Sequence, residues 1–139
     1  MTRLILLFVI AATLGIAGCA STSDRLLDSG QSQVGLRSIE SRAFDTTDKL
    51  AVMRAVVSSM QDLGFIVSKA DTTLGTVSGS KFDKGKVSMT VIVRPHGPKQ
   101  CMVRANANYK LKQITDPKVY QSFFNVLSKA LFLQAQQVE

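Results

Sequence analysis

The sequence predicts an α+β fold, a two-layer sandwich in which two helices cover one face of an antiparallel sheet of four or five strands. One observation is a pair of amphipathic stretches with helical spacing, the second of them close to the C-terminus. The other is a series of short alternating segments separated by turn residues. Elements with one apolar side bury those sides against each other. The expected order is β-α-β-β-β-β-α in a single domain over residues 37–139.

The first helix is predicted after the segment 45–48, Asp-Thr-Thr-Asp, which supplies N-cap side chains. Gly64 stands where a left-handed residue commonly ends a helix. A strand is expected before this helix, over residues 37–44, although its alternation is weak. The apolar residues at helical spacing are Leu50, Met53, Val56, Val57, Met60 and Leu63.

Four strands are predicted to follow, at about 65–70, 74–82, 87–94 and 101–109. Turn residues separate them: Asp71-Thr72-Thr73, then Asp83-Lys84-Gly85, then Pro95-His96-Gly97-Pro98. In the last two strands, alternate residues are apolar. Successive turns between short strands are typical of an antiparallel meander with one buried face.

The last helix is predicted to begin at Asp116-Pro117, an N-cap residue followed by proline at the first helical position. Its apolar stripe is wide enough for one buried helix face. The residues of the stripe are Tyr120, Phe123, Phe124, Leu127 and Leu131.

The N-terminus has the pattern of a secretory signal. Met1-Thr2-Arg3 is a short basic start, and an apolar run over residues 4–16 follows it directly. This run is shorter than the roughly 20 apolar residues that a helix needs to cross a bilayer. Residues 1–18 are therefore left out of the fold prediction.

The signal ends in Ile16-Ala17-Gly18-Cys19, which resembles the lipobox of bacterial lipoprotein precursors. The resemblance implies cleavage between Gly18 and Cys19, with lipid attached to the sulfur of Cys19. The alternative is an ordinary secretory signal with a chance cysteine at this point. By the same resemblance, Ala20 and Ser21 without a following aspartate favour the outer membrane, with the protein facing the periplasm.

Residues 19–36 are rich in serine, aspartate, glutamine and glycine, and we expect a lipidated flexible tether there. The following chain, from Phe44-Asp45 through Gly64-Phe65 to Asp116-Pro117, resembles a recurring pattern in uncharacterised Gram-negative outer-membrane lipoproteins. The element order is also similar to the helix-grip domains of BamC-type lipoproteins of the β-barrel assembly machinery. These likenesses imply a fold and a role beside an assembly or efflux complex, by analogy alone.

Residue types offer little for catalysis. The single histidine, His96, falls in a predicted turn, where a catalytic triad is hard to organise. Cys101, the one cysteine besides Cys19, aligns with the apolar residues of its strand and is expected in the core rather than as a reactive thiol. One histidine and one cysteine do not make a zinc site. We therefore expect no enzyme, no metal and no cofactor.

The candidate partner-binding face is the side of the sheet opposite the helices. It mixes amide, cationic and exposed apolar groups, as interface cores do, but an ordinary half-solvated sheet has the same pattern. The net charge is +7, with an excess of lysine and arginine over residues 81–112. An envelope protein partner is the leading hypothesis, a binder of lipid or lipopolysaccharide the alternative, and nucleic acid is not expected. The face comprises Ile92, Arg94, Met102, Arg104, Asn106, Asn108 and Lys110, with Thr90 beside them.

Overall fold

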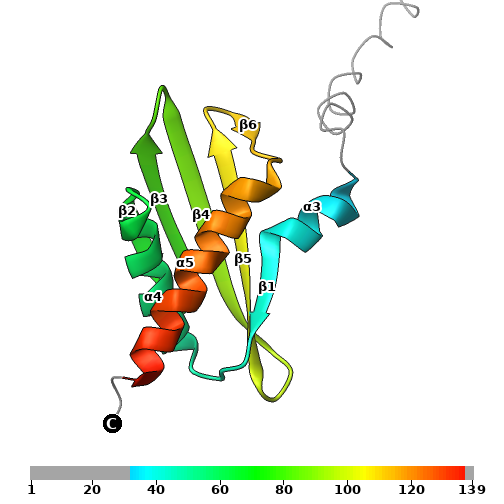
Figure 1. Cartoon of the computed structure of the whole chain (residues 1–139), viewed down its shortest axis with the longest axis vertical. Helices are drawn as coiled ribbons and strands as arrows, with labels where there is room; N and C mark the ends of the chain where they lie inside the picture. Colours follow the sequence, from blue (N-terminus) through cyan, green and yellow to red (C-terminus); the bar gives the residue numbers. More distant parts are fainter. Residues whose placement is uncertain (1–31, 137–139) are drawn as a thin grey trace, which may run out of the picture. The chain divides into compact units, whose positions relative to one another are not determined.

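The computed structural model describes residues 32–136, and its α+β sandwich confirms the predicted fold class. Two helices, α4 and α5, lie side by side over one face of an antiparallel sheet (Figure 1). The sandwich lies in the compact unit Gln31–Glu139. In chain order the elements are α3 (Gln33–Glu40), β1 (Ser41–Phe44), α4 (Lys49–Asp62), β2 (Ile66–Asp71), β3 (Thr76–Phe82), β4 (Lys86–His96), β5 (Gln100–Tyr109), β6 (Lys112–Gln113) and α5 (Pro117–Gln136).

The strands lie in the order β1-β5-β4-β3-β2, and β6 pairs with the end of β5. Strands β2 to β5 form the predicted meander, each pairing antiparallel with the next. β1 joins from far away in the sequence, with Arg42 opposite Val103. In the central register Val91 lies opposite both Val77 and Ala105, so small and branched apolar residues share the face toward the helices.

Both long helices begin at the residues that the sequence predicts, and α4 ends just before the predicted Gly64. The carboxylate of Asp48 accepts a hydrogen bond from the Ala51 backbone N–H at 2.9 Å at the start of α4. Gly64, just after α4, has φ +80°, the left-handed conformation that glycine adopts without strain. Pro117 opens α5, and the Asp116 carboxylate accepts from the Lys118 N–H at 2.9 Å.

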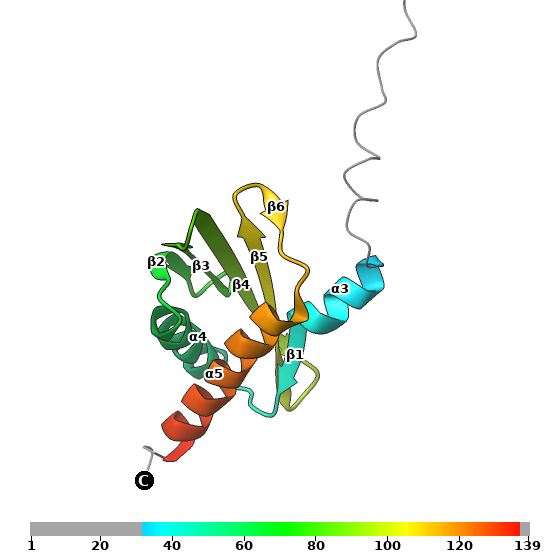
Figure 2. The same cartoon turned by 45° about the horizontal axis from the view of Figure 1, so that its top comes forward.

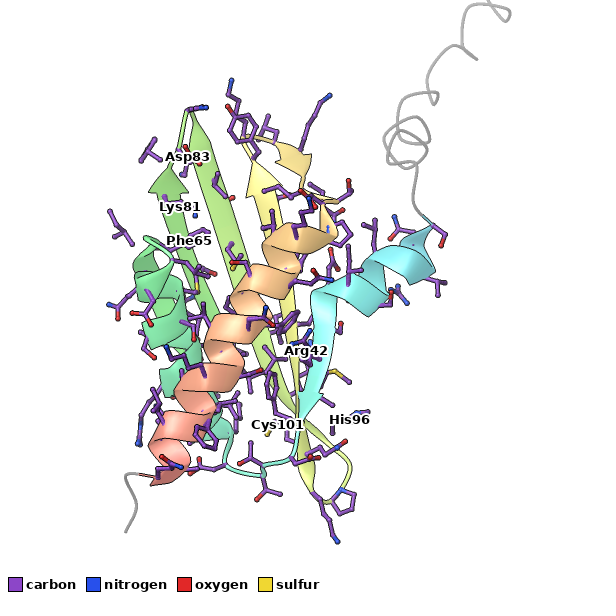
Figure 3. All side chains as sticks on the ribbon, viewed as in Figure 1. Arg42, Phe65, Lys81, Asp83, His96 and Cys101 are labelled. Carbon is purple, nitrogen blue, oxygen red and sulfur yellow. The ribbon has the colours of Figure 1, made fainter. Side chains whose placement is uncertain are left out.

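The core lies between the helices and the sheet, and α5 supplies its largest side chains. Phe123 and Phe124 meet edge to face, with ring centroids 5.2 Å apart. Arg42 lies on β1 (Figure 3), and its guanidinium is 4.9 Å from the ring centroid of Phe124. The fully buried apolar residues include Val52, Val56, Met60, Val77, Val91, Val93, Val103, Tyr120, Phe123, Phe124 and Leu127.

The segment before β1 departs from the prediction. Residues 37–40, expected to start a strand, belong to helix α3, so the predicted boundary between tether and domain at residues 36 and 37 falls inside a helix. The Ser32 hydroxyl caps this helix by accepting from the Gly35 N–H at 3.1 Å. Leu36, predicted in the tether, is buried and holds the helix to the domain. Residues 1–31 lie outside the described residues. They include Gly18, the predicted cleavage position, and Cys19, the predicted lipid attachment site.

Two glycine turns close the end of the sheet opposite the β3–β4 turn. Gly75 precedes β3 with φ +70°, and a Cβ atom there would lie 2.3 Å from the carbonyl oxygen of Val93. Gly97 lies between β4 and β5 with φ +65°, and a Cβ atom there would meet no atom within 4 Å. The two positions therefore share a backbone conformation but differ in the space around them.

Candidate functional site

The residues predicted to bind a partner lie, apart from Lys110, on the side of the sheet away from α4 and α5. On β4 and β5 its residues alternate with buried core residues, as the alternation predicted. The register places Ile92 opposite Arg104, Arg94 opposite Met102, and Thr90 opposite Asn106. Lys110 does not belong to this face, because it lies in the turn after β5 with φ +54°. The sheet face is thus Thr90, Ile92, Arg94, Met102, Arg104, Asn106 and Asn108.

Hydroxyl groups extend the same face over β3. Ser78 lies opposite Thr90, and their hydroxyl oxygens are 3.2 Å apart. Ser80 lies opposite Ser88 in the same register, so both share this side of the sheet. The face therefore has a hydroxyl-rich half on β3 and β4 and an amide- and guanidinium-rich half on β5.

A buried carboxylate organises the β5 half. Glu40, the last residue of α3, has an acidic side chain and is only 1% exposed. Its carboxylate accepts hydrogen bonds from Arg104 Nη2 at 3.1 Å, from Asn106 Nδ2 at 3.4 Å and from Gln113 Nε2. A buried carboxylate without such donors would be strongly destabilising, so these partners are required at this position.

Hydrogen bonds to the Glu40 carboxylate restrict side chains that the sequence alone suggests are free to rotate. Arg104 and Asn106 both point to Glu40, and Asn108 Nδ2 donates to Asn106 Oδ1 at 3.0 Å. The Arg104 side chain is still 46% exposed, so part of the guanidinium remains open to a partner. Sequence reasoning missed Glu40, because a single glutamate within the weakly alternating segment 37–44 carries no signal of burial.

Glu40 lies beside a gap in the edge of the sheet. β1 pairs with β5 as far as Arg104 and β6 pairs from Asn108 onward, so residues 105–107 lie between the two. Here Ile114 N–H donates to the Ala107 carbonyl at 2.8 Å. The Tyr120 hydroxyl donates to the Ile114 carbonyl at 2.6 Å and accepts from the Ala107 N–H at 3.4 Å. The N–H and the carbonyl of Ala107 are therefore both satisfied, from α5 and its preceding loop.

Tyr120 remains protonated in this position. Burial raises the pKa of its phenol, the hydrogen bond from Ala107 lowers it, and the negative charge of Glu40 raises it again. The net shift is upward, so the hydroxyl keeps the proton that it donates to Ile114. The Tyr120 hydroxyl thus acts as both a donor and an acceptor for backbone groups at the gap in the sheet edge.

Cys101 lies in the core, where its alternation placed it, and is 1% exposed. Burial raises the pKa of its thiol, and the charge of Asp48 raises it further, while Lys49 opposes them. The thiol is therefore neutral and enclosed, whereas nucleophilic cysteines are thiolates within reach of solvent. His96 is exposed at the far end of β4 (Figure 3).

An open groove lies between α4 and the end of β2. Its volume is about 340 Å³, and Leu50, Met53 and Val57 supply its apolar wall. Arg54, Ser58, Gln61, Ala70 and Thr72 complete the lining. The space between the helices and the sheet, where the lipid-binding alternative expects an acyl chain, is filled by core side chains in the described part of the chain. An acyl chain there would require the core to rearrange.

Comparison with known proteins adds no family to this description. The sequence matches no protein-family model, and a search of curated proteins finds no match. Within residues 32–136, no group of three or more histidine, cysteine or carboxylate side chains is placed to hold a metal ion. In the same range, none of the helices is both long and apolar enough to span a bilayer.

Proposed function

We propose that this protein is an outer-membrane lipoprotein, anchored through Cys19 and facing the periplasm, whose folded unit is a non-enzymatic binding module. In this proposal the module docks on a protein complex of the cell envelope, of an assembly or efflux type. The motif Ile16-Ala17-Gly18-Cys19 supports the anchor. The sheet face opposite α4 and α5 supports the docking surface.

The observation that carries the docking proposal is the order imposed on that face by Glu40. Side chains that are already fixed lose less conformational entropy when a partner covers them. Arg104 and Asn106 are fixed by the buried carboxylate, and Asn108 by Asn106. Beside them lie Ile92 and Met102, half-buried apolar side chains of the kind found in interface cores.

The docking proposal predicts that a photo-crosslinking amino acid at Thr90 in the full-length protein captures one discrete envelope protein in living cells. Thr90 is exposed, lies centrally on the face and is not one of the three residues that donate to Glu40. The matched control is Lys129, exposed on α5. Ile92→Glu should abolish the Thr90 crosslink, because a charge would be desolvated in the interface.

Two outcomes contradict docking through this face. One is the absence of any captured protein at Thr90 and Arg94 while other positions crosslink. The other is capture of the same protein from Lys129 with equal yield, which would place the interface on the helical side.

The anchor is tested by the intact mass of the mature protein. We expect a chain that begins at Cys19, with a diacylglycerol thioether and an acylated amino group. Cys19→Ala should leave the protein as an uncleaved precursor or release it from the outer membrane, because two or more acyl chains supply stable anchoring. A mature N-terminus that carries no lipid would contradict this part of the proposal and leave the docking face unaffected.

A further inference from the structure

The excess of positive charge over residues 81–112 does not form one surface, because the fold divides it. Lys81 is engaged at the end of α4, where its Nζ donates to the Leu63 carbonyl at 3.1 Å and lies 4.7 Å from the ring centroid of Phe65 (Figure 3). Lys99 lies in the turn between β4 and β5, at the same end of the sheet as His96. The remaining lysines gather at the opposite end.

Two hairpin turns lie together at that end and form what we call the double tip, residues 82–86 and 109–112 (Figures 1 and 2). The Tyr109 hydroxyl donates to the Lys84 carbonyl at 2.9 Å. The Lys110 N–H donates to the Lys86 carbonyl at 2.8 Å. These bonds join the β3–β4 turn to the β5–β6 turn in one protrusion.

The double tip combines exposed apolar side chains with a ring of cations. Leu111 is 99% exposed and Phe82 is 80% exposed, the highest values among the large apolar residues of the described chain. Asp83 is the single acidic residue between Lys81 and Lys112. The surrounding lysines, all exposed, are Lys84, Lys86, Lys110 and Lys112.

Two of these lysines occupy strained backbone positions. Lys84 has φ +53° and Lys110 has φ +54°, and they are the two non-glycine residues with positive φ in residues 32–136. Glycine or asparagine would adopt this conformation at lower cost. Strained residues of this kind concentrate at functional sites. The turns therefore carry lysine where turn formation alone favours another residue.

This chemistry fits an anionic bilayer surface better than a protein. Lysine is depleted in protein interfaces, where its strongly hydrated ammonium is costly to cover. At a bilayer the ammonium groups remain hydrated among lipid phosphates, while neighbouring aliphatic and aromatic side chains enter the headgroup boundary.

We propose that the double tip binds the surface of an anionic phospholipid bilayer, with Leu111 and Phe82 in the headgroup boundary and the four lysines on lipid phosphates. The contact would hold the domain in one orientation and leave the sheet face of Thr90 and Arg94 open to the periplasm. It goes beyond the proposed docking function and does not depend on lipid at Cys19.

The test uses the unlipidated unit 31–139, which contains the whole described core and is expected to fold alone. We expect it to sediment with vesicles of equal parts phosphatidylglycerol and phosphatidylcholine, but not with pure phosphatidylcholine. Binding should weaken as salt rises. Leu111→Ser should weaken binding about tenfold, and Lys110→Gln roughly fivefold.

Matched controls lie at the other end of the sheet. Leu74→Ser alters a leucine that is 64% exposed before β3, and Lys99→Gln removes a charge from the β4–β5 turn; neither should change binding. Equal binding to both vesicle types, no binding to either, or equal losses at Leu74 and Leu111 would overturn the proposal. Circular dichroism of each variant verifies folding.

Discussion

Phe123→Ala is expected to lower the free energy of unfolding by about 3–5 kcal/mol. Phe123 is fully buried in the N-terminal half of α5 and contacts Phe124 edge to face. Truncation removes its buried apolar surface and leaves a cavity that the surrounding strands fill only in part. Because domains of this size have a total stability of about 5–15 kcal/mol, the variant should be largely unfolded under mild denaturing conditions.

Urea unfolding followed by circular dichroism measures this loss. Phe132→Ala is the matched control, since it makes the same change in the same helix at a residue that is 63% exposed. We expect the control to change stability by no more than about 0.5 kcal/mol. Similar losses in both variants would show that α5 is held by its helical propensity rather than by the core beneath it.

Gly75→Ala should be nearly as damaging, at about 3 kcal/mol or more. The new Cβ would lie 2.3 Å from the Val93 carbonyl oxygen, and φ +70° is unfavourable for alanine. The backbone has little room to shift, because the Gly75 carbonyl accepts a hydrogen bond from the Val93 N–H at 2.7 Å. The substitution therefore forces the β3 and β4 backbones apart.

Gly97→Ala separates the cost of the left-handed backbone conformation from the cost of the contact with the Val93 carbonyl. Gly97 has nearly the same φ, +65°, but a Cβ there meets no atom within 4 Å. Its expected cost is the conformational one alone, about 1–2 kcal/mol. Denaturant midpoints of both variants measure the difference. Equal losses would mean that backbone strain, not the contact with Val93, makes glycine necessary at position 75.

The elements that the sequence predicts correctly carry local signals. Asp48 and Gly64 delimit α4, and Asp116 with Pro117 opens α5, because each acts on backbone groups a few residues away. The alternation in β4 and β5 predicted which side chains face the helices, since side chains alternate strictly along a strand. The candidate face apart from Lys110 followed from that alternation alone.

The parts that the sequence did not predict depend on distant partners. The residues of α3 were predicted to belong to the tether and to a strand. Leu36 is the one buried apolar residue of this helix, and a single apolar position does not produce a helical pattern in the sequence. Glu40 is buried through Arg104, Asn106 and Gln113, more than sixty residues away. The sequence did not predict the double tip either, because only the fold places Lys99 at one end of the sheet and Lys86 and Lys110 at the other.

The pairing of β1 with β5 has a consequence for the order in which the molecule acquires its structure. The hairpins from β2 to β5 close locally, but Arg42 meets its strand partner only when Val103 is in place. Contacts of such long range form slowly, because a large loop must close first. Strand β1 is thus expected to pair later than the strands of the meander, and until then Glu40 has not been covered by Arg104, Asn106 and Gln113.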